Sequence, residues 1–156
     1  MSCAAAGQPA STPLVTWGFD PIYFGGERMT VQHLDRVGDG ARPIVVAHAN
    51  GHLLNASSAM LAIAGVDADC DVEGVVKFDA AAGGALAGQP TGELQEPAAM
   101  GLVLRHVGNA GLLAPLDPPG LQAFGAICRL QGVTTATDLV NRLGERELAV
   151  LRQCTG

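Results

Sequence analysis

Short apolar runs alternate with turn residues along the chain, and their spacing predicts an α/β protein. Ile44–Ala47 is a continuous run, mostly β-branched, bounded by turn residues, as is typical of a buried strand. Val75–Phe78 predicts a second short strand, and the glycines of the stretch 80–88 predict a turn or hairpin after it. The first strand leads into a loop, residues 48–52, and then into a helix.

Five helices are predicted from apolar residues at helical spacing and from residues able to begin or end a helix. They begin after Thr30, after Asn55, at Pro97, after Asp117 and near Glu145. Gly65 suits the end of the second helix, and Gly132 suits the end of the fourth. A β-rich run, residues 133–138, separates the last two helices, so residues 117–156 read as helix, strand, helix. Such units normally belong to a larger parallel sheet or barrel.

The first residues of the chain look different from the rest. Residues 1–16 are expected to form a flexible leader, because their first thirteen positions are mostly small or polar. The aromatic segment that follows, residues 17–26, holds four of the aromatic side chains and is expected to plug one end of the core.

Composition and charge narrow the classes of partner. The chain has 156 residues, 48% of them hydrophobic, which fits one domain with one core. The net charge is −6 and the arginines are scattered, so neither nucleic acid nor an anionic membrane surface is an expected partner. No apolar stretch is long enough to span a bilayer, and the four cysteines are widely separated, which favours reduced thiols in a cytoplasmic protein.

Two histidines follow the first predicted strand. His48 and His52 are four residues apart, the spacing that places two metal ligands on one helix face. Asn50 and Gly51 disfavour a helix there and no glutamate lies between the histidines, so non-ligand histidines are the favoured interpretation. They nevertheless lie just beyond the C-terminal end of a strand, where functional residues often gather.

Three acidic residues are further candidates. Glu93 and Glu96 could act as a carboxylate pair, although their spacing equally suits acids in the first turn of a helix. Asp138 ends the last predicted strand, where barrel enzymes place catalytic groups, and it could equally cap a helix. There is no G-x-S-x-G motif and no phosphate-binding glycine motif, so nucleophilic catalysis has no support in the sequence.

Five stretches occur in the order found in one family of hydrolases. The stretch His48-Ala-Asn-Gly-His52-Leu-Leu-Asn55-Ala-Ser57-Ser-Ala-Met resembles the "H-x-S-G-H…N-S-x-A-L" stretch of amidohydrolase family 3. The other four are Leu34-Asp35 with Arg42-Pro43, then Gly65-Val66, Gly88-Gln-Pro-Thr-Gly92-Glu-Leu-Gln-Glu96 and Gly132-Val-Thr-Thr-Ala-Thr-Asp138. The chain departs from the family at Asn50, where serine is common, and by a one-residue shift of the Asn-Ser pair.

The resemblance implies part of a metal-dependent enzyme that hydrolyses C–N bonds of small amide-type molecules. It implies a partial (β/α)8 TIM-barrel fragment, with residues 17–116 as an inserted α/β segment and residues 117–156 as a barrel helix-strand-helix. The metal, zinc or a similar divalent ion, would be held by an HxH motif and later strands that this chain does not contain, so tight metal binding is not expected. The resemblance assigns substrate contact to His52 first, and also to His48, Glu96 and Asp138.

Two other interpretations stay open from the sequence. The chain could be a non-catalytic interaction module, completed by a partner chain that carries the metal-binding strand or by self-association. It could also be a small single-domain α/β enzyme that uses His48, His52 and Glu96 directly. The latter requires those three side chains to converge within hydrogen-bonding distance.

Overall fold

The computed structural model describes residues 9, 11–107, 116–137 and 143–155. The chain forms two compact units, Met1–Leu112 and Leu113–Gly156, and each is described by itself.

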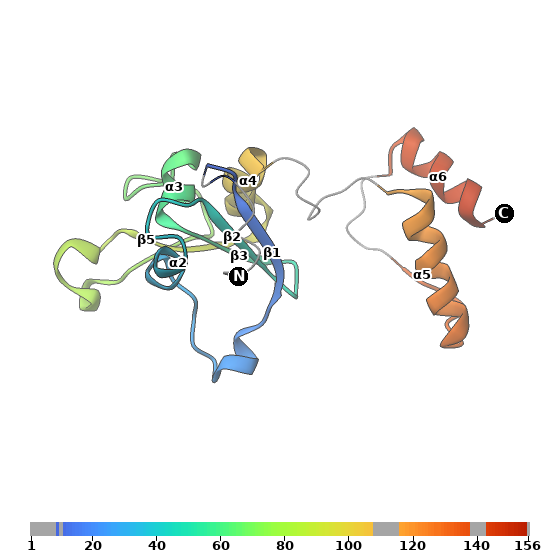
Figure 1. Ribbon diagram of the computed structural model, residues 1–156, viewed down its shortest axis with the longest axis horizontal. Coiled ribbons are helices and arrows are strands. Elements are labelled where there is room, and N and C mark those ends of the chain that lie inside the picture. Colours follow the sequence, from blue (N-terminus) through green and yellow to red (C-terminus); the bar gives the residue numbers. More distant parts are fainter. Residues whose placement is uncertain (1–8, 10, 108–115, 138–142, 156) are drawn as a thin grey trace. The chain divides into compact units, whose positions relative to one another are not determined.

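The first unit is built on a five-stranded sheet with the strand order β1-β2-β3-β5-β4 (Figure 1). Its strands are β1 (Leu14–Phe19), β2 (Ile44–His48), β3 (Leu53–Ala56), β4 (Val75–Lys77) and β5 (Pro90–Gln95). β1 pairs with β2 in parallel, and the other neighbours are antiparallel. The α/β class predicted from the sequence is confirmed. A TIM barrel has parallel strands throughout, so this mixed sheet is not a section of barrel wall.

Three helices cover the two faces of this sheet, and α3 and α4 lie above it in the view of Figure 1. They are α2 (Val31–Val37), α3 (Ser58–Ala64) and α4 (Glu96–Val107). Short 3-10 turns occur at η1 (Pro21–Phe24), η2 (Ala80–Ala82) and η3 (Gly84–Leu86). The larger core cluster joins the sheet to α3 and α4, and a smaller one joins it to α2. The larger cluster includes Val45, Leu54, Leu94, Met60 and Val103, and the smaller comprises Leu14, Ile44, Val46 and Leu34.

The segment after β2 differs from its prediction. β2 itself is confirmed, and all five of its residues are buried. It is followed by a second strand, β3, before the helix begins, and Asn55 lies in that strand. The expected helix cap at Asn55 is therefore wrong. Ser57 caps α3 instead, because its hydroxyl accepts a hydrogen bond from the Met60 N–H at 3.3 Å.

The N-terminal prediction also needs correction. β1 begins at Leu14, inside the expected leader, because Leu14 is buried and its N–H donates to the Pro43 carbonyl at 2.9 Å. The aromatic segment plugs the core only in part: Phe19 packs against the smaller core cluster, whereas other aromatic side chains of the segment face solvent. Trp17 is 66% and Tyr23 82% exposed. Asp20 caps η1 by accepting from the Ile22 N–H, so the chain leaves the edge of the sheet in a tight turn and its side chains point outward.

The predicted turn over residues 80–88 is confirmed as the connection of the β4–β5 hairpin. β5 was not predicted, since Thr91 is its only β-branched residue. Gly92 brings it close to its neighbours. This glycine has φ of +93°, and a Cβ added there would lie 2.5 Å from the Ala56 carbonyl oxygen and 2.9 Å from Val31 Cγ1. A side chain at position 92 would push β5 away from β3 and from α2.

The described residues of the second unit form two helices, α5 (Pro118–Leu130) and α6 (Glu145–Thr155). Asp117 caps α5 as predicted, accepting from the Gly120 N–H at 3.0 Å. The predicted strand over residues 133–138 is wrong where the structure describes it, because residues 133–137 form no strand. A strand requires a neighbouring strand to satisfy its backbone groups, and the described part of this unit offers none. Asp138 lies outside the described residues.

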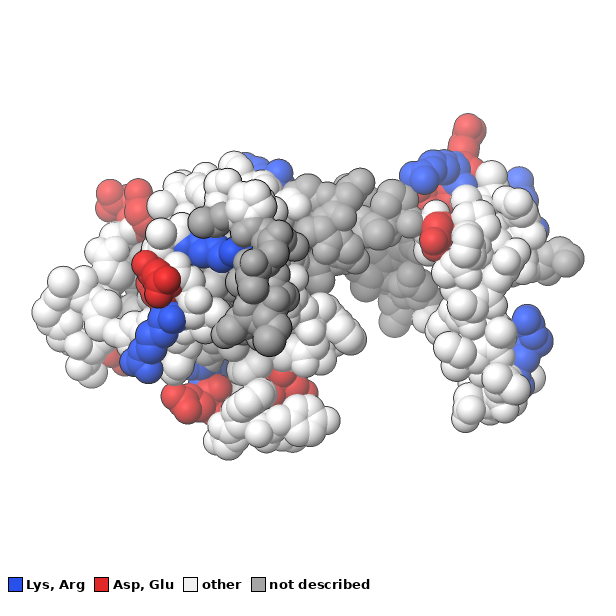
Figure 2. All heavy atoms as spheres, in the orientation of Figure 1, with Lys and Arg blue, Asp and Glu red and all other residues white. Residues whose placement is uncertain are grey.

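Charged side chains are dispersed over the surface shown in Figure 2, in agreement with the absence of a basic run in the sequence. Among the described residues, no helix combines the length and the apolar character needed to cross a membrane. Among the described residues, Cys70, Cys128 and Cys154 form no disulfide and are partly buried.

Candidate functional site

Two of the motif stretches meet where β3 and β5 lie side by side. β3 pairs with β5 so that Leu53 lies opposite Gln95, which places the neighbouring residues His52 and Glu96 together. Nδ1 of His52 lies 3.2 Å from Oε2 of Glu96, and the Glu96 N–H donates to the His52 carbonyl at 2.9 Å. Both side chains are about two-thirds exposed. The structure therefore joins two of the predicted site residues into one His–Glu pair.

The turn between β2 and β3 presents His52. The His52 N–H donates to Oδ1 of Asn50 at 2.9 Å, and Gly51 adopts φ of +75°. Asn and Gly favour such a turn because one side chain satisfies a backbone N–H and the other residue accepts a positive φ. Residues 48–52 thus form the connection between two strands. This connection holds His48 at the end of β2 and His52 directly before β3.

Glu96 adopts a backbone conformation that is unusual for its residue type. Its φ is +63°, a left-handed value that costs a non-glycine residue about 1–2 kcal/mol. The residue is exposed, so burial of its side chain does not explain this cost. Strained positions of this kind gather at functional sites, where the surrounding structure holds them.

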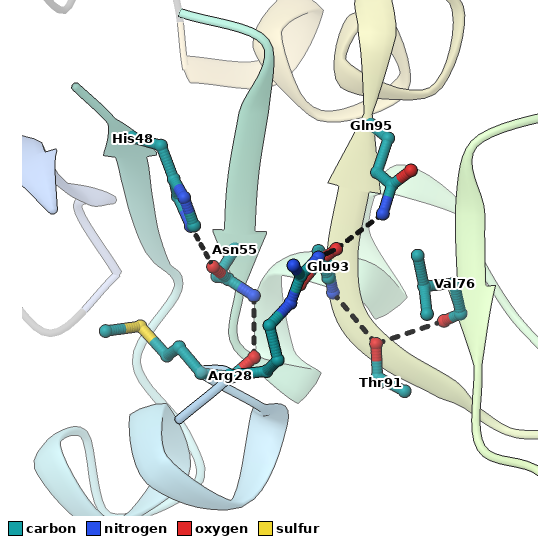
Figure 3. Close-up of polar contacts among 8 residues, drawn as sticks. Arg28, His48, Asn55, Val76, Thr91, Glu93 and Gln95 are labelled. Carbon is teal, nitrogen blue, oxygen red and sulfur yellow. Dashed lines mark hydrogen bonds and ion pairs between the residues drawn. The ribbon is translucent and has the colours of Figure 1, made fainter. Parts of the chain in front are cut away.

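His48 is held differently, inside the fold. Its Nε2 lies 2.6 Å from Oδ1 of Asn55, and Nδ2 of Asn55 donates to the Met29 carbonyl at 2.8 Å. Figure 3 shows this chain of contacts running from β2 through β3 towards the segment before α2. The side chain is 2% exposed. His48 and His52 thus have separate partners, and no hydrogen bond between them is found among the described residues.

An ion pair between a buried carboxylate and a half-exposed guanidinium lies beside this chain of contacts (Figure 3). Glu93 of β5 is 3% exposed, and Nε of Arg28 donates to its Oε2 at 2.8 Å. Arg28 Nη2 pairs with the other carboxylate oxygen, which also accepts from Nε2 of Gln95 at 2.6 Å. The hydrogen bond with Glu93 raises the pKa of Arg28 above its ordinary value, so the guanidinium stays charged. Glu93 is a strand residue, and its interpretation as a first-turn acid is wrong. Glu96 does begin α4.

Several other motif residues have structural roles. Asp35 accepts from the backbone N–H of Ser58 at 2.9 Å and from its hydroxyl at 2.7 Å, which ties α2 to the start of α3. The Ser57 hydroxyl donates to the Arg42 carbonyl at 3.0 Å and accepts from the Ile44 N–H. These contacts give Asp35 and Ser57, which belong to the motif stretches, structural roles that require no ligand. The exposed His52–Glu96 pair is not accounted for in this way.

The convergence required for a small self-contained enzyme is only partly present. His52 and Glu96 touch, but the buried ring of His48 bonds to Asn55 instead. Arg28 was not singled out from the sequence. No local pattern marks it, because its partner Glu93 lies 65 residues away.

The described residues do not fit a metal centre. No group of three or more histidine, cysteine, aspartate or glutamate side chains in them is arranged to hold a metal ion. A hydrolytic metal ion normally takes at least three protein ligands. The His52–Glu96 pair alone supplies too few, so no catalytic step through a metal is derived from these residues.

A separate hollow of about 340 Å³ lies between α2, α3 and the β4–β5 hairpin. Most of its lining is apolar and includes Val31, Leu61, Phe78 and Leu86. Neither His52 nor Glu96 lines it, so it is distinct from the His–Glu pair.

Comparison with known proteins gives two solved structures. The first is an uncharacterized metal-dependent hydrolase from Pyrococcus furiosus, with 19% identity and a TM-score of 0.43 over 95% of this chain and 26% of that one. The second is an uncharacterized metal-dependent hydrolase from Pyrococcus horikoshii OT3, with 17% identity and a TM-score of 0.42 over 94% and 26% of the two chains. The chain thus spans about a quarter of their length. No family model and no curated protein matches. Similarity at this level does not establish a shared fold or reaction.

Proposed function

We propose that this chain is the substrate-contacting part of a metal-dependent hydrolase that cleaves C–N bonds of small amide-type molecules. The resemblance of its five motif stretches to amidohydrolase family 3 motivates the reaction class. The observation that carries the proposal is the exposed His52–Glu96 contact, which joins residues of two motif stretches 44 positions apart.

The pair is suited to holding a substrate rather than to stabilising the fold. An exposed ion pair contributes at most about 1 kcal/mol, and the left-handed backbone of Glu96 offsets that gain. When Nδ1 of His52 carries a proton and donates a hydrogen bond to the carboxylate of Glu96, the neutral ring leaves Nε2 unprotonated. That nitrogen can accept a hydrogen bond from the N–H of an amide substrate.

The metal and its ligands come from outside the described residues in this proposal. The isolated chain is therefore expected to hydrolyse nothing, with or without added zinc. Turnover of small amides by the purified, zinc-loaded chain would contradict the fragment interpretation.

A binding experiment tests the role of the pair directly. N-methylacetamide at millimolar concentration is expected to shift the His52 ring resonances in NMR spectra of the chain. The shift should weaken in Glu96→Gln, and His52→Ala identifies the ring resonances of His52 by removing them. His106→Ala is the matched control, because His106 is also an exposed histidine of the same unit. An unchanged His52 ring in the presence of the amide would contradict the assignment.

A second candidate function, an interaction module, is favoured by the surface of the second unit. α5 buries none of its residues, and Phe124, Ile127 and Leu130 are more than half exposed. Exposed apolar patches commonly mark binding surfaces. Sedimentation of the purified chain, alone and mixed with any chain encoded directly upstream, tests this function. A monomer in both samples would argue against it.

A further inference from the structure

The hollow between α2, α3 and the β4–β5 hairpin has the size of a small-molecule site. Its volume of about 340 Å³ lies at the lower end of the range of known ligand pockets. Three separate elements form its walls. Val31 begins α2, Leu61 lies in α3, and Phe78 and Leu86 belong to the connection of the hairpin. A ligand in the hollow would therefore contact several elements at once.

The apolar part of the lining is held in place by the core. Leu61 and Val66 are each 5% exposed and belong to the larger core cluster, and Phe78 packs against that cluster. Side chains fixed in this way keep the hollow open without a ligand. Apolar walls with one aromatic ring favour a ligand whose body is apolar.

One carboxylate lines the hollow beside these apolar side chains. Asp67 directly follows Val66 and is exposed. Its Oδ1 accepts from the Asp69 N–H at 3.0 Å, and among the described residues it forms no ion pair. None of the residues described as lining the hollow is a lysine or an arginine. The Nζ of Lys77 donates to the Ala68 carbonyl at 2.6 Å instead. The hollow therefore presents a negative charge that has no partner cation.

Further acidic groups lie around the hollow. Residues 67–73 contain four acidic side chains and no basic one. At another wall, the carboxylate of Asp35 accepts from the hydroxyl of Ser58, a lining residue, at 2.7 Å. Charges of one sign around a hollow attract ligands of the opposite sign and repel those of the same sign.

We propose that this hollow binds a small primary amine with an apolar body, in the form of its ammonium ion. The body of the ligand would pack against the apolar walls, and the ammonium group would donate to the carboxylate of Asp67. Burial of the body supplies affinity, and the ion pair supplies selectivity for a cation. Neither His52 nor Glu96 lines the hollow, so this inference does not depend on the proposed hydrolase function.

Benzylamine and benzyl alcohol form a matched pair of probes, because both carry the same ring and only the amine is charged at neutral pH. The ¹⁵N-labelled full chain is titrated with each probe at low salt. Benzylamine is expected to shift the amide resonances of Asp67 and Phe78 and to bind about fivefold more tightly than the alcohol. Salt at about 1 M should reduce this preference, because it screens charges. Equal affinity for the two probes, or shifts confined to residues outside the lining, would overturn the proposal.

A pair of matched variants tests the carboxylate. Asp67→Asn removes the charge and retains an oxygen that can accept from the Asp69 N–H, so the preference for benzylamine should disappear. Asp71→Asn removes the same charge from an exposed residue of the same acidic stretch that does not line the hollow, and should retain the preference. Equal losses in the two variants would show a diffuse attraction to the acidic stretch and would contradict the site.

A second pair of variants tests the hollow itself. Ala62→Phe places a ring in the hollow from an exposed position of α3 and should weaken the binding of both probes. Ile63→Phe changes the next residue, which is 50% exposed and does not line the hollow, and should leave binding unchanged. Circular dichroism confirms that both variants are folded. Undiminished binding to folded Ala62→Phe would contradict the site. The titration with N-methylacetamide reports on His52, so failure of either proposal is recognised separately.

Discussion

The two units of this chain differ in how they bury apolar side chains. The first closes a sheet between helices, and the fully buried apolar residues of the described chain, from Leu14 to Val103, all belong to it. In the second, α5 carries apolar residues at helical spacing, yet none of them is buried. Equal helix-forming patterns thus have different outcomes. A helix gains most of its stability from the surface that it packs against, and within the described residues only the first unit supplies one that buries apolar side chains.

The largest expected effect is on the core of the first unit. Leu94→Ala removes a fully buried side chain between β3 and β4, and should lower the free energy of unfolding by about 2–5 kcal/mol. Ile127→Ala in α5 is the contrasting variant and should change it by less than about 0.5 kcal/mol. Urea unfolding followed by circular dichroism measures both. Comparable losses of unfolding free energy in the two variants would contradict the difference in burial between the two units.

Arg28→Ala should have the next largest effect. It leaves the buried carboxylate of Glu93 without its cation, although the Arg28 side chain is 54% exposed and water reduces the cost. A loss of about 1–3 kcal/mol is expected by the same urea measurement. Arg36→Ala is the control, since it removes an exposed arginine from α2. If both variants have the same free energy of unfolding, the ion pair does not stabilise the first unit.

Asp117→Ala tests the second unit alone. It removes the cap of α5 and should destabilise that helix by about 0.5–2 kcal/mol. Hydrogen exchange should accelerate at amides of α5 and stay unchanged in β2 and β3. Asp117→Asn retains the capping oxygen and should behave like the natural chain. Faster exchange throughout the first unit would show that the two units unfold together.

The smallest expected effect is a gain. Glu96→Gly relieves the left-handed backbone at φ +63° and should stabilise the first unit by up to about 1 kcal/mol. It also removes the carboxylate beside His52, so the response of that ring to N-methylacetamide should weaken. Thermal unfolding and the NMR titration measure the two effects. A less stable variant would show that Glu96 contributes more through its contacts than its backbone costs.

Much of the fold follows from local sequence. The continuous run at Ile44–Ala47, the proline after Asp117 and the glycine at position 65 each act within a few residues, and β2, α5 and the end of α3 appear where they were predicted. β5 was missed because Pro90-Thr-Gly-Glu-Leu-Gln has no β-branched run. It is a strand because β3 and β4 lie on either side of it. The Asn-Gly turn before His52 was a usable signal for the β2–β3 hairpin, and the helical interpretation of Asn55 overlooked it.

The candidate site was predictable only in part. The motif resemblance named His52 and Glu96, but their contact depends on the register of β3 against β5, which no local pattern fixes. His48 was named for the same reason, and the structure gives it a buried position with its own partner. The predicted strand before Asp138 failed because β-branched residues alone do not supply a neighbouring strand. Substrate contact by Asp138 and membership in a barrel stay predictions.

Gly92 has a consequence for recognising distant relatives. Because the space beside it is filled by Ala56 and Val31, any larger residue would act as a wedge between two strands. His52 and Glu96 lie directly beside the ends of those same strands, so a single methyl group at position 92 would shift one half of the pair relative to the other. A homologue that has both the histidine and the glutamate should therefore also have a glycine at position 92. A homologue with a larger residue there is expected to lack the histidine, the glutamate or both.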